Sequence, residues 1–326
     1  MFSLDKESRD PWFNIALEEH LLRHAEVDIF MLWENSPSLI VGKHQNPFLE
    51  IKPEYLLTDT IPVIRRISGG GTVFHGSGNL NFTFITNSKT DEDKINFKKF
   101  TQPILDLLNK MGVAAEMTGK SNLTVDGLKF SGNAAHVFKN RSIHHGTLLF
   151  DADLALIKHY LRPTTEHINS RAVASIRAQV TNLKPLLPEN MALNTFQKKL
   201  KQTVLAFFGN EGTYQLTDIE INKIKDLSNS KYKTNTWNFG YSPDYSLSRS
   251  IETAAFDADL KLQVNKGVIS SVKLSGLKQK KLAWEIERIL AGKFHHPKDL
   301  QQALEPLLSA KNISKTEQQK LIIQLF

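Results

Sequence analysis

The spacing of hydrophobic and polar residues predicts a mixture of helices and strands. Asp10-Pro11 is typical of a helix start, because aspartate caps free N–H groups and proline is tolerated in the first turn. Residues 97–111 and 192–208 carry apolar side chains at helical spacing, and a glycine follows each run. Strand-like runs occupy residues 28–33, 38–42, 63–67, 72–75, 79–85 and 144–150, and Asp126-Gly127 predicts a hairpin turn between two further strands.

The pattern loosens at residues 237–250, where Gly, Pro, Ser and aromatic residues gather. Beyond this stretch the sequence predicts a hairpin over 261–274 and then helices. We therefore expect an α+β fold with a domain boundary in this region. The large domain, residues 1–245, should hold mixed or mainly antiparallel sheets flanked by helices, and residues 250–326 a small α+β accessory domain.

Composition narrows the class of protein. The 326 residues are 40% hydrophobic, and no apolar run is long enough to span a bilayer. The first residues, MFSLDKESRD, do not resemble a signal peptide, so we expect a cytoplasmic protein. The net charge of +7 comes from interspersed charges. The first interpretation of such a pattern is a solvated surface, and the second is an acidic partner or substrate. The absence of cysteine excludes disulfides, cysteine metal sites and a cysteine nucleophile.

The clearest chemical signal is RRISGGGTVFHGSGNLNF, residues 65–82. Consecutive glycines cost conformational entropy and are tolerated where a ligand approaches the backbone, whose N–H groups can then cradle an anion. Arg65 and Arg66 on a strand would point to opposite faces, so at most one faces a ligand. Three glycines alone favour a tight turn beside surface arginines. The Arg, Ser, Asn and His residues around them favour a binding site.

A second signal is GLKFSGNAA, residues 127–135. Leu128 and Phe130 should face one side of a strand and Lys129 the other. A single lysine on a strand usually faces solvent, but small polar residues suited to a groove follow this one. A lysine ammonium can neutralise phosphate and carboxylate oxygens as charge develops on them.

Two other patterns are weaker. The histidines in and around HHGTLL, residues 144–149, could suggest a metal site, but no local ligand pattern supports one. Adjacent histidines on a strand point apart, which favours a hydrogen-bonded pocket histidine. AAEMTGKS, residues 114–121, resembles a loosened P-loop, yet the residues after it predict a hairpin rather than the required helix.

These blocks, in this order, resemble the lipoate–protein ligase A family of the biotin/lipoate ligase group. The resemblance extends over DPWFNIALEEHLL (10–22), GKHQNP (42–47), ASIRAQVTNL (174–183) and WNFG (237–240). It implies a two-step reaction, in which lipoate and MgATP give lipoyl-AMP and pyrophosphate, and an acceptor lysine then displaces AMP. An octanoyltransferase of this fold would need a cysteine, which the chain lacks.

The resemblance also implies roles for individual residues. Lys129 matches the essential catalytic lysine of the family. The positions implied for ATP or adenylate are Arg66, Ser68, Gly69, Gly70, Gly71, Thr72, Val73, Phe74 and Lys129. Those implied for lipoate are Gly71, His75, Asn79, Lys129, Ser131, Gly132, Asn133, His145, Gly146 and Thr147.

The implied ligands are lipoate as substrate and Mg²⁺ with ATP, without a tightly bound cofactor. The implied protein partners are lipoyl acceptor domains, from 2-oxo acid dehydrogenase E2 subunits, the glycine-cleavage H protein or both. We expect neither nucleic acid nor a membrane as a partner, because no basic cluster is interleaved with aromatic residues and no spanning segment is present.

The chain departs from the family pattern at Lys43, Gly76, Ala135 and Asn122. Asn122 replaces an aspartate associated with the metal, and an uncharged amide oxygen binds Mg²⁺ less strongly. One alternative is therefore a lipoyltransferase that uses preformed lipoyl-AMP or another lipoyl donor and activates free lipoate weakly. A non-enzymatic alternative is a protein that only binds lipoyl domains.

Overall fold

The computed structural model describes residues 1–58, 61–88, 90, 94–162, 168–188 and 191–326. The chain forms two compact units. The first contains Met1–Gly42, Val63–Ile157 and Ile176–Thr234, and the second contains Lys43–Pro62, Lys158–Ser175 and Asn235–Phe326. This division differs from the predicted domains, because 43–62 and 158–175 pack with the C-terminal part instead of the N-terminal part.

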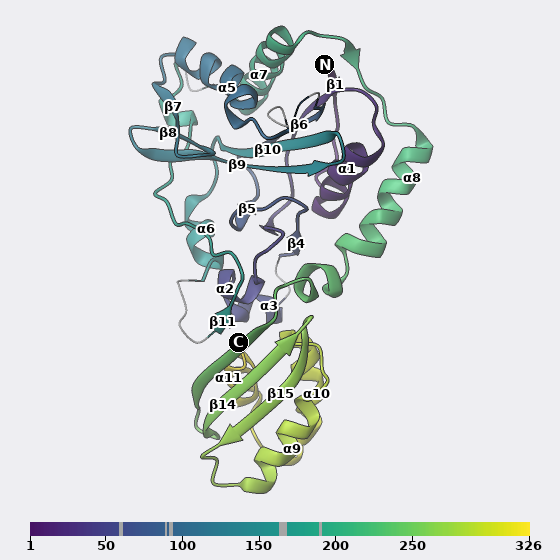
Figure 1. Ribbon diagram of the computed structural model, residues 1–326. Helices are drawn as coiled ribbons and strands as arrows, with labels where there is room; N and C mark the ends of the chain where they lie inside the picture. The colour runs from purple at the N-terminus through teal and green to yellow at the C-terminus, as the bar shows by residue number, and fades with distance from the viewer. Residues whose placement is uncertain (59–60, 89, 91–93, 163–167, 189–190) are drawn as a thin grey trace. The chain divides into compact units, whose positions relative to one another are not determined.

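The first unit is built on an eight-stranded sheet in the order β12-β1-β2-β6-β10-β9-β8-β7 (Figure 1). Only β1 forms parallel pairs, with β2 and β12, so the sheet is mixed and mainly antiparallel as predicted. Its strands are β1 (Phe2–Leu4), β2 (Ile29–Trp33), β6 (Asn79–Asn87), β7 (Ala115–Thr118), β8 (Asn122–Val125), β9 (Leu128–Phe138), β10 (Arg141–Leu149) and β12 (Gly212–Thr213).

Helices α5 (Phe97–Lys110) and α7 (Leu193–Phe208) supply apolar side chains that bury one face of this sheet. Strand β6 shows why, since Leu80, Phe82 and Phe84 alternate with polar residues and enter this core. Burial of such side chains stabilises the fold by roughly 1.5–3 kcal/mol each. The opposite face of the sheet, which carries the polar residues, contacts α1 (Pro11–His24).

The predicted helix start at Asp10-Pro11 is confirmed. The Asp10 carboxylate accepts hydrogen bonds from the N–H groups of Trp12 and Phe13 at 2.9 and 3.3 Å. The helix buries polar residues as well as apolar ones, and the carboxylates of Glu18 and Glu19 are both buried. Buried charges require partners, and Glu18 finds its partners in the site described below.

The remaining elements of the first unit are a small sheet and connecting helices. The sheet has the order β4-β3-β5, with β3 (Ser38–Val41) between β4 (Val63–Arg65) and β5 (Val73–His75). The helical segments are η1 (Lys184–Leu186), α8 (Asp218–Leu227) and η3 (Ser228–Tyr232), while α6 (Leu154–Tyr160) contains the boundary between the two units.

The second unit contains a four-stranded antiparallel sheet in the order β11-β13-β14-β15. Its strands are β11 (Ile168–Ser170), β13 (Tyr245–Glu252), β14 (Asp257–Asn265) and β15 (Val268–Ser275), and its helical segments are α2 (Pro47–Glu50), α3 (Pro53–Thr58), η4 (Thr236–Gly240), α9 (Lys280–Leu290), α10 (Pro297–Ala310) and α11 (Lys315–Gln324). Phe48 packs its ring against Phe239 and Phe326. Contacts of this kind, and the pairing of β11 with β13, explain why the internal segments join the C-terminal part.

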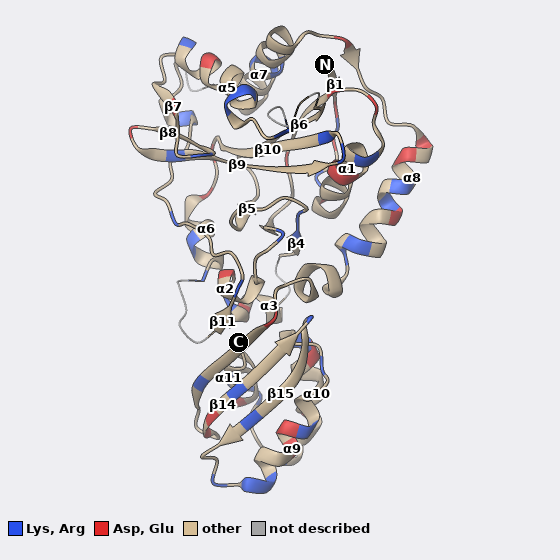
Figure 2. Cartoon of the chain, in the orientation of Figure 1, with Lys and Arg blue, Asp and Glu red and all other residues tan. Residues whose placement is uncertain are grey.

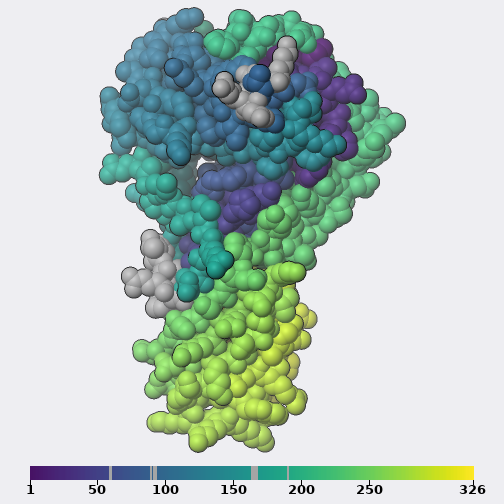
Figure 3. Space-filling model, viewed as in Figure 1, coloured from purple at the N-terminus to yellow at the C-terminus, as the bar shows by residue number. Residues whose placement is uncertain are grey.

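Both units carry interspersed charges on their elements (Figure 2). Figure 3 shows one face of the surface, on which the C-terminal part of the second unit is coloured green to yellow. Within the part of the chain that the structure describes, no helix is both long and apolar enough to cross a membrane.

His144 on β10 faces the helix-covered side of the large sheet. Its ring stacks on Phe100 with 4.3 Å between centroids, and its Nε2 lies 3.1 Å from the carbonyl oxygen of Lys94. Burial lowers the pKa of His144 to about 4. Because the unfolded chain binds a proton at this histidine nearer pH 6.5, stability contributed by the neutral ring is lost as the pH falls from about 6.5 to about 4.

We expect His144→Phe to make the protein less sensitive to acid. Phenylalanine keeps the stacking and removes the titrating group, so the loss of unfolding free energy between about pH 7 and 4.5 should shrink by about 2 kcal/mol. Urea denaturation at the two pH values measures this. Equal losses in the variant and the wild type would show that another group accounts for the acid sensitivity.

Candidate active site

The register of β6, β9 and β10 gathers polar side chains on the sheet face opposite α5 and α7. His145 pairs directly with Thr83 on β6 and with Ala134 on β9, so these side chains share one face. Thr147 pairs with Asn81 on the same face. His144 lies on the other face, which confirms that the two adjacent histidines point apart.

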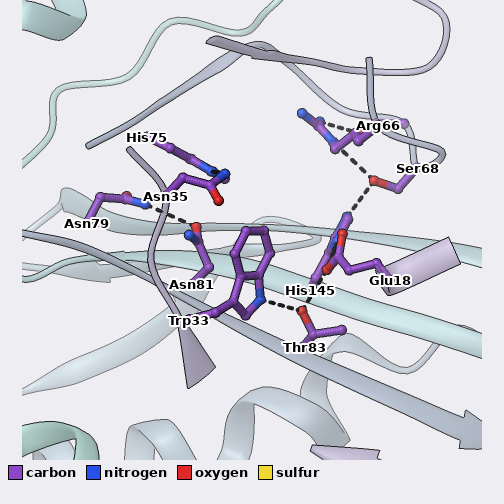
Figure 4. Close-up of polar contacts among 11 residues, drawn as sticks. Glu18, Trp33, Asn35, Arg66, Ser68, His75, Asn79, Asn81, Thr83 and His145 are labelled. Carbon is purple, nitrogen blue, oxygen red and sulfur yellow. Dashed lines mark hydrogen bonds and ion pairs between the residues drawn. The ribbon is translucent and has the colours of Figure 1, made fainter. Parts of the chain in front are cut away.

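The segment between β4 and β5, residues 66–72, is called the glycine loop here. A chain of hydrogen bonds links α1, β10 and this loop (Figure 4). His145 Nδ1 lies 2.8 Å from Glu18 Oε1, and its Nε2 lies 2.5 Å from Ser68 Oγ. Because a carboxylate only accepts, the proton sits on Nδ1 and the Ser68 hydroxyl can donate to Nε2. Glu18 Oε1 also accepts from the Thr83 hydroxyl at 2.6 Å, which in turn accepts from Trp33 Nε1 at 2.9 Å.

Arg66 holds the glycine loop from inside. Its Nε donates to Ser68 Oγ at 3.0 Å and its Nη1 to the Ile40 carbonyl at 3.1 Å. Its Nη2 donates to the carbonyl oxygens of Gly69 and Gly71, at 2.5 and 2.8 Å. The guanidinium therefore makes four hydrogen bonds to the protein itself and supports the loop.

The backbone N–H groups of the loop are left available. Among the described residues, the amides of Gly69, Gly70 and Gly71 donate to no protein acceptor. Gly70 has φ +86°, and a Cβ there would lie 3.0 Å from Arg66 Nη2 and 3.9 Å from the Cβ of Ala134. The loop thus lies against the polar face of the sheet with free donors, an arrangement suited to an anion.

Arg65 and Arg66 are both buried, so the simpler interpretation of surface arginines beside a turn is wrong. Arg65 Nη1 donates to the Gly42 carbonyl at 3.0 Å. Burial lowers the pKa of Arg66 to about 10, and the charge of Glu18 partly opposes this. Arg66 therefore remains a cation at neutral pH.

Lys129 reaches the same face through a β-bulge. Thr124 pairs with Lys129 whereas Leu123 pairs with Ser131, so Phe130 is the extra residue and points into the core. A Cβ at Gly132 would lie 3.0 Å from Lys129 Nζ, so this glycine leaves room for the lysine. Burial, and secondarily the charge of Arg66, lowers the pKa of Lys129.

The Lys129 ammonium has neither a hydrogen bond nor an ion pair with any residue that the structure describes. A partly buried cation without a counter-ion, beside the buried cation Arg66, favours an anionic ligand. The free loop amides and this ammonium together define a site that attracts negative oxygens.

The bulge moves two predicted residues away from this face. Ser131 and Asn133 fall on the helix-covered side, where Asn133 Nδ2 donates to the Ser121 carbonyl at 2.8 Å and to Ser131 Oγ at 3.3 Å. These residues hold the loop before β8. A side chain at Gly146 would collide with Asn133 Oδ1 and come within 2.6 Å of the Phe82 ring, so this glycine serves packing.

Asn79 and His75, which the sequence predicted as lipoate-binding residues, lie among the polar residues. Asn79 Nδ2 donates to Asn81 Oδ1 at 3.0 Å, and Asn79 Oδ1 has no partner among the described residues. His75, at the end of β5, lies 3.0 Å from Asn35 through its Nδ1 (Figure 4). Thr72 precedes this strand and Val73 and Phe74 lie within it, and the side chains of Thr72 and Phe74 are buried.

Sequence reasoning missed Glu18, Trp33, Asn35 and Thr83, which complete the polar network. One signal was available, because ALEEHLL places two acidic residues inside an apolar helical run. The partners of these acids lie far away in the chain and could not be assigned from local patterns.

The described residues offer no cluster of three or more His, Asp or Glu that could hold a metal ion by themselves. Asn122 pairs with Gly132 and therefore shares the face of Lys129. Its amide oxygen could contribute one ligand to an ion that arrives with phosphate oxygens, as Mg²⁺ usually does.

Comparison with known proteins gives a consistent result. Residues 10–205 match the family model of the lipoyl protein ligase A/B catalytic domain. Lipoate-protein ligase LplJ of Bacillus subtilis is 37% identical over 312 residues, covering 94% of this chain and 94% of that protein. Lipoate–protein ligase 1 of Staphylococcus aureus is 39% identical over 271 residues, covering 82% of this chain and 81% of that protein.

Solved structures share the fold. LipL1 of P. falciparum in complex with lipoate has a TM-score of 0.63 and 23% identity, covering 99% of both chains. A lipoate-protein ligase A bound with ATP has a TM-score of 0.63 and 21% identity, covering 74% of this chain and 98% of that chain.

The chain therefore has the α+β fold that these structures share. The chain belongs to the lipoate–protein ligase family, as the sequence motifs predicted.

We expect Gly146→Ala to destabilise the protein by about 1–3 kcal/mol, because the added methyl group overpacks a site already filled by Asn133 and Phe82. Gly69→Ala is the matched control, since a Cβ there meets no atom within 4 Å. Urea denaturation of both variants measures the difference. Equal stabilities would contradict the packing role of Gly146.

Proposed function

We propose that this ligase activates lipoate with MgATP to lipoyl-AMP and transfers the lipoyl group to a lysine of an acceptor lipoyl domain. The observation that supports this most directly is that the free amides of the glycine loop and the partner-free ammonium of Lys129 lie on the same polar face of the sheet. Both steps of such a reaction collect negative charge on carboxylate and phosphate oxygens. Fixed donors in a water-poor site stabilise that charge without reorganisation.

In the first step a lipoate oxygen attacks the α-phosphorus of ATP, and pyrophosphate leaves with the electrons of the broken P–O bond. No protein nucleophile is required, so positioning and charge stabilisation supply the catalysis. Lys129 neutralises the attacking carboxylate and the α-phosphate together. The amides of Gly69, Gly70 and Gly71 donate to phosphate oxygens, while Arg66 fixes their direction by binding the loop carbonyls.

In the second step the amine of the acceptor lysine attacks the acyl carbon of lipoyl-AMP. An amide forms, AMP leaves with the bonding electrons, and the amine loses a proton. The acceptors we propose are lipoyl domains of 2-oxo acid dehydrogenase E2 subunits, the glycine-cleavage H protein or both. One solved relative in fold is an archaeal bipartite lipoate protein ligase reported with its E2 lipoyl domain.

Mg²⁺ enters this scheme with ATP as part of the substrate. Asn122 lies on the face of Lys129 and supplies an uncharged oxygen where a carboxylate would bind the ion more strongly. This single observation favours the second candidate, a lipoyltransferase that uses preformed lipoyl-AMP or another lipoyl donor. A protein that only binds lipoyl domains is disfavoured, because the chain belongs to a family of ligases.

We expect Lys129→Ala to reduce lipoate-dependent ATP–pyrophosphate exchange at least about 100-fold, because the charge beside the reacting oxygens is lost. Its unfolding free energy should change little, since the ammonium has no partner in the described part of the chain. Lys110→Ala, an exposed lysine at the end of α5, is the control and should retain exchange. Normal exchange in Lys129→Ala would refute the assignment of this lysine.

We expect Asn122→Asp to lower the Mg²⁺ concentration needed for half-maximal exchange, because a carboxylate binds the ion more tightly than an amide. A titration of exchange rate with Mg²⁺ measures this. If the requirement is unchanged, position 122 does not contact the metal. If the wild type shows no exchange but transfers from supplied lipoyl-AMP, the lipoyltransferase candidate is the correct one.

A further inference from the structure

A second hydrogen-bonded chain begins at Lys6 and fixes the orientation of every amide in it. A lysine ammonium only donates, and Lys6 Nζ contacts Asn14 Oδ1, so this oxygen is the acceptor. Asn14 Nδ2 is then the donor, and it reaches the carbonyl oxygens of Ser8 and Glu34 at 3.1 and 3.2 Å. Two carbonyls that only accept and one ammonium that only donates therefore give the same assignment independently.

The assignment passes through Asn35 to His75. Asn14 Nδ2 donates to Asn35 Oδ1 at 2.8 Å, so Asn35 presents its Nδ2 to His75 Nδ1 at 3.0 Å (Figure 4). A donor facing Nδ1 requires a lone pair there. A neutral imidazole without a proton on Nδ1 carries it on Nε2. His75 is thereby set as a donor through Nε2.

The Nε2 atom of His75 has no partner among the described residues. It is not one of their fully buried unpaired polar atoms, although the residue is only 4% exposed, so this nitrogen is a donor that a ligand oxygen can reach. Arg66 and His145 lie close enough to His75 to influence its protonation, which places the ring among the residues of the site.

We propose that Lys6, Asn14 and Asn35 are positioning residues that hold His75 as the Nε2–H tautomer, so that it donates to an anionic oxygen of the bound carboxylate or acyl phosphate. This inference rests on the proposed function. The opposite tautomer would turn a nitrogen lone pair toward that oxygen and repel it.

The surroundings keep this state across the physiological range. Burial first, then the charges of Arg66 and His145, lower the pKa of His75 to about 3. These two groups face the ring from the glycine loop and from β10, with Glu18 behind His145, and the neighbouring Trp33 ring is uncharged. Burial also lowers the pKa of Lys6 to about 7, but a neutral amine still donates, and the backbone carbonyls keep Asn14 in place.

The discriminating variant is Asn35→Asp, which preserves shape and inverts polarity. A carboxylate only accepts, so it draws the His75 proton to Nδ1 and turns the Nε2 lone pair toward the ligand. We expect lipoate-dependent ATP–pyrophosphate exchange to fall about 10- to 100-fold near pH 8. The new negative charge raises the pKa of His75, and below that pKa the imidazolium donates from Nε2 again, so activity should recover on acidification.

Asn210→Asp is the matched control, because it adds the same charge at an exposed position where Oδ1 only accepts from the Gly212 amide at 3.0 Å. It should keep the wild-type rate and pH profile. An Asn35→Asp protein that keeps the wild-type rate, or loses rate equally at every pH, would overturn the positioning role.

The tautomer itself is measurable without substrate, by ¹⁵N NMR of the histidine rings of the ligand-free wild-type chain, with His75→Gln for assignment. We expect a protonated Nε2 and an unprotonated Nδ1 at neutral pH. A protonated Nδ1 would refute the proposal whether or not Asn35→Asp folds. Since this readout needs neither lipoate nor ATP, its outcome is independent of the proposed ligase reaction, which the wild-type exchange assay tests separately.

Discussion

The site depends on one buried cation that binds backbone instead of ligand. Arg66 donates to the carbonyls of Gly69, Gly71 and Ile40, and these bonds decide which way the peptide groups of the glycine loop face. A guanidinium without such acceptors could not remain buried, since desolvation of an unpaired charge is very costly. The loop carbonyls stabilise the arginine, and the arginine leaves the loop amides directed elsewhere. These bonds also restrict the glycines before any ligand binds. Less conformational entropy is then lost when the loop binds a ligand.

The same cation is connected to the rest of the first unit through Ser68, His145 and Glu18. This chain crosses from the loop to β10 and on to α1, so helix, sheet and loop constrain one another. The resulting site contains the cations Arg66 and Lys129 together with the rings of His75 and His145. Two cations at one site suit substrates that bring their own negative oxygens.

The local features of this protein were predictable because they depend on local periodicity. Alternation over 79–85 and helical spacing over 97–111 gave β6 and α5, and Asp10-Pro11 gave the start of α1. The glycine loop was identifiable as a candidate because Arg, Ser, Asn and His residues surround its glycines, and Lys129 because small polar residues follow it. The sequence also determined the family, since the motifs stand in an order that a matching family model confirms.

Tertiary structure alone decided which residues meet. His145 and Glu18 are 127 residues apart, and only the packing of α1 against β10 brings them to 2.8 Å. A single bulge at Phe130 moves Ser131 and Asn133 to the other face of β9. Side chains alternate with a period of two along a strand, so one inserted residue reverses the face of those that follow. Residues 43–62 and 158–175 belong to the second unit because of strand pairing and ring packing with residues far along the chain. Such long-range contacts depend on tertiary packing, which local sequence patterns do not specify.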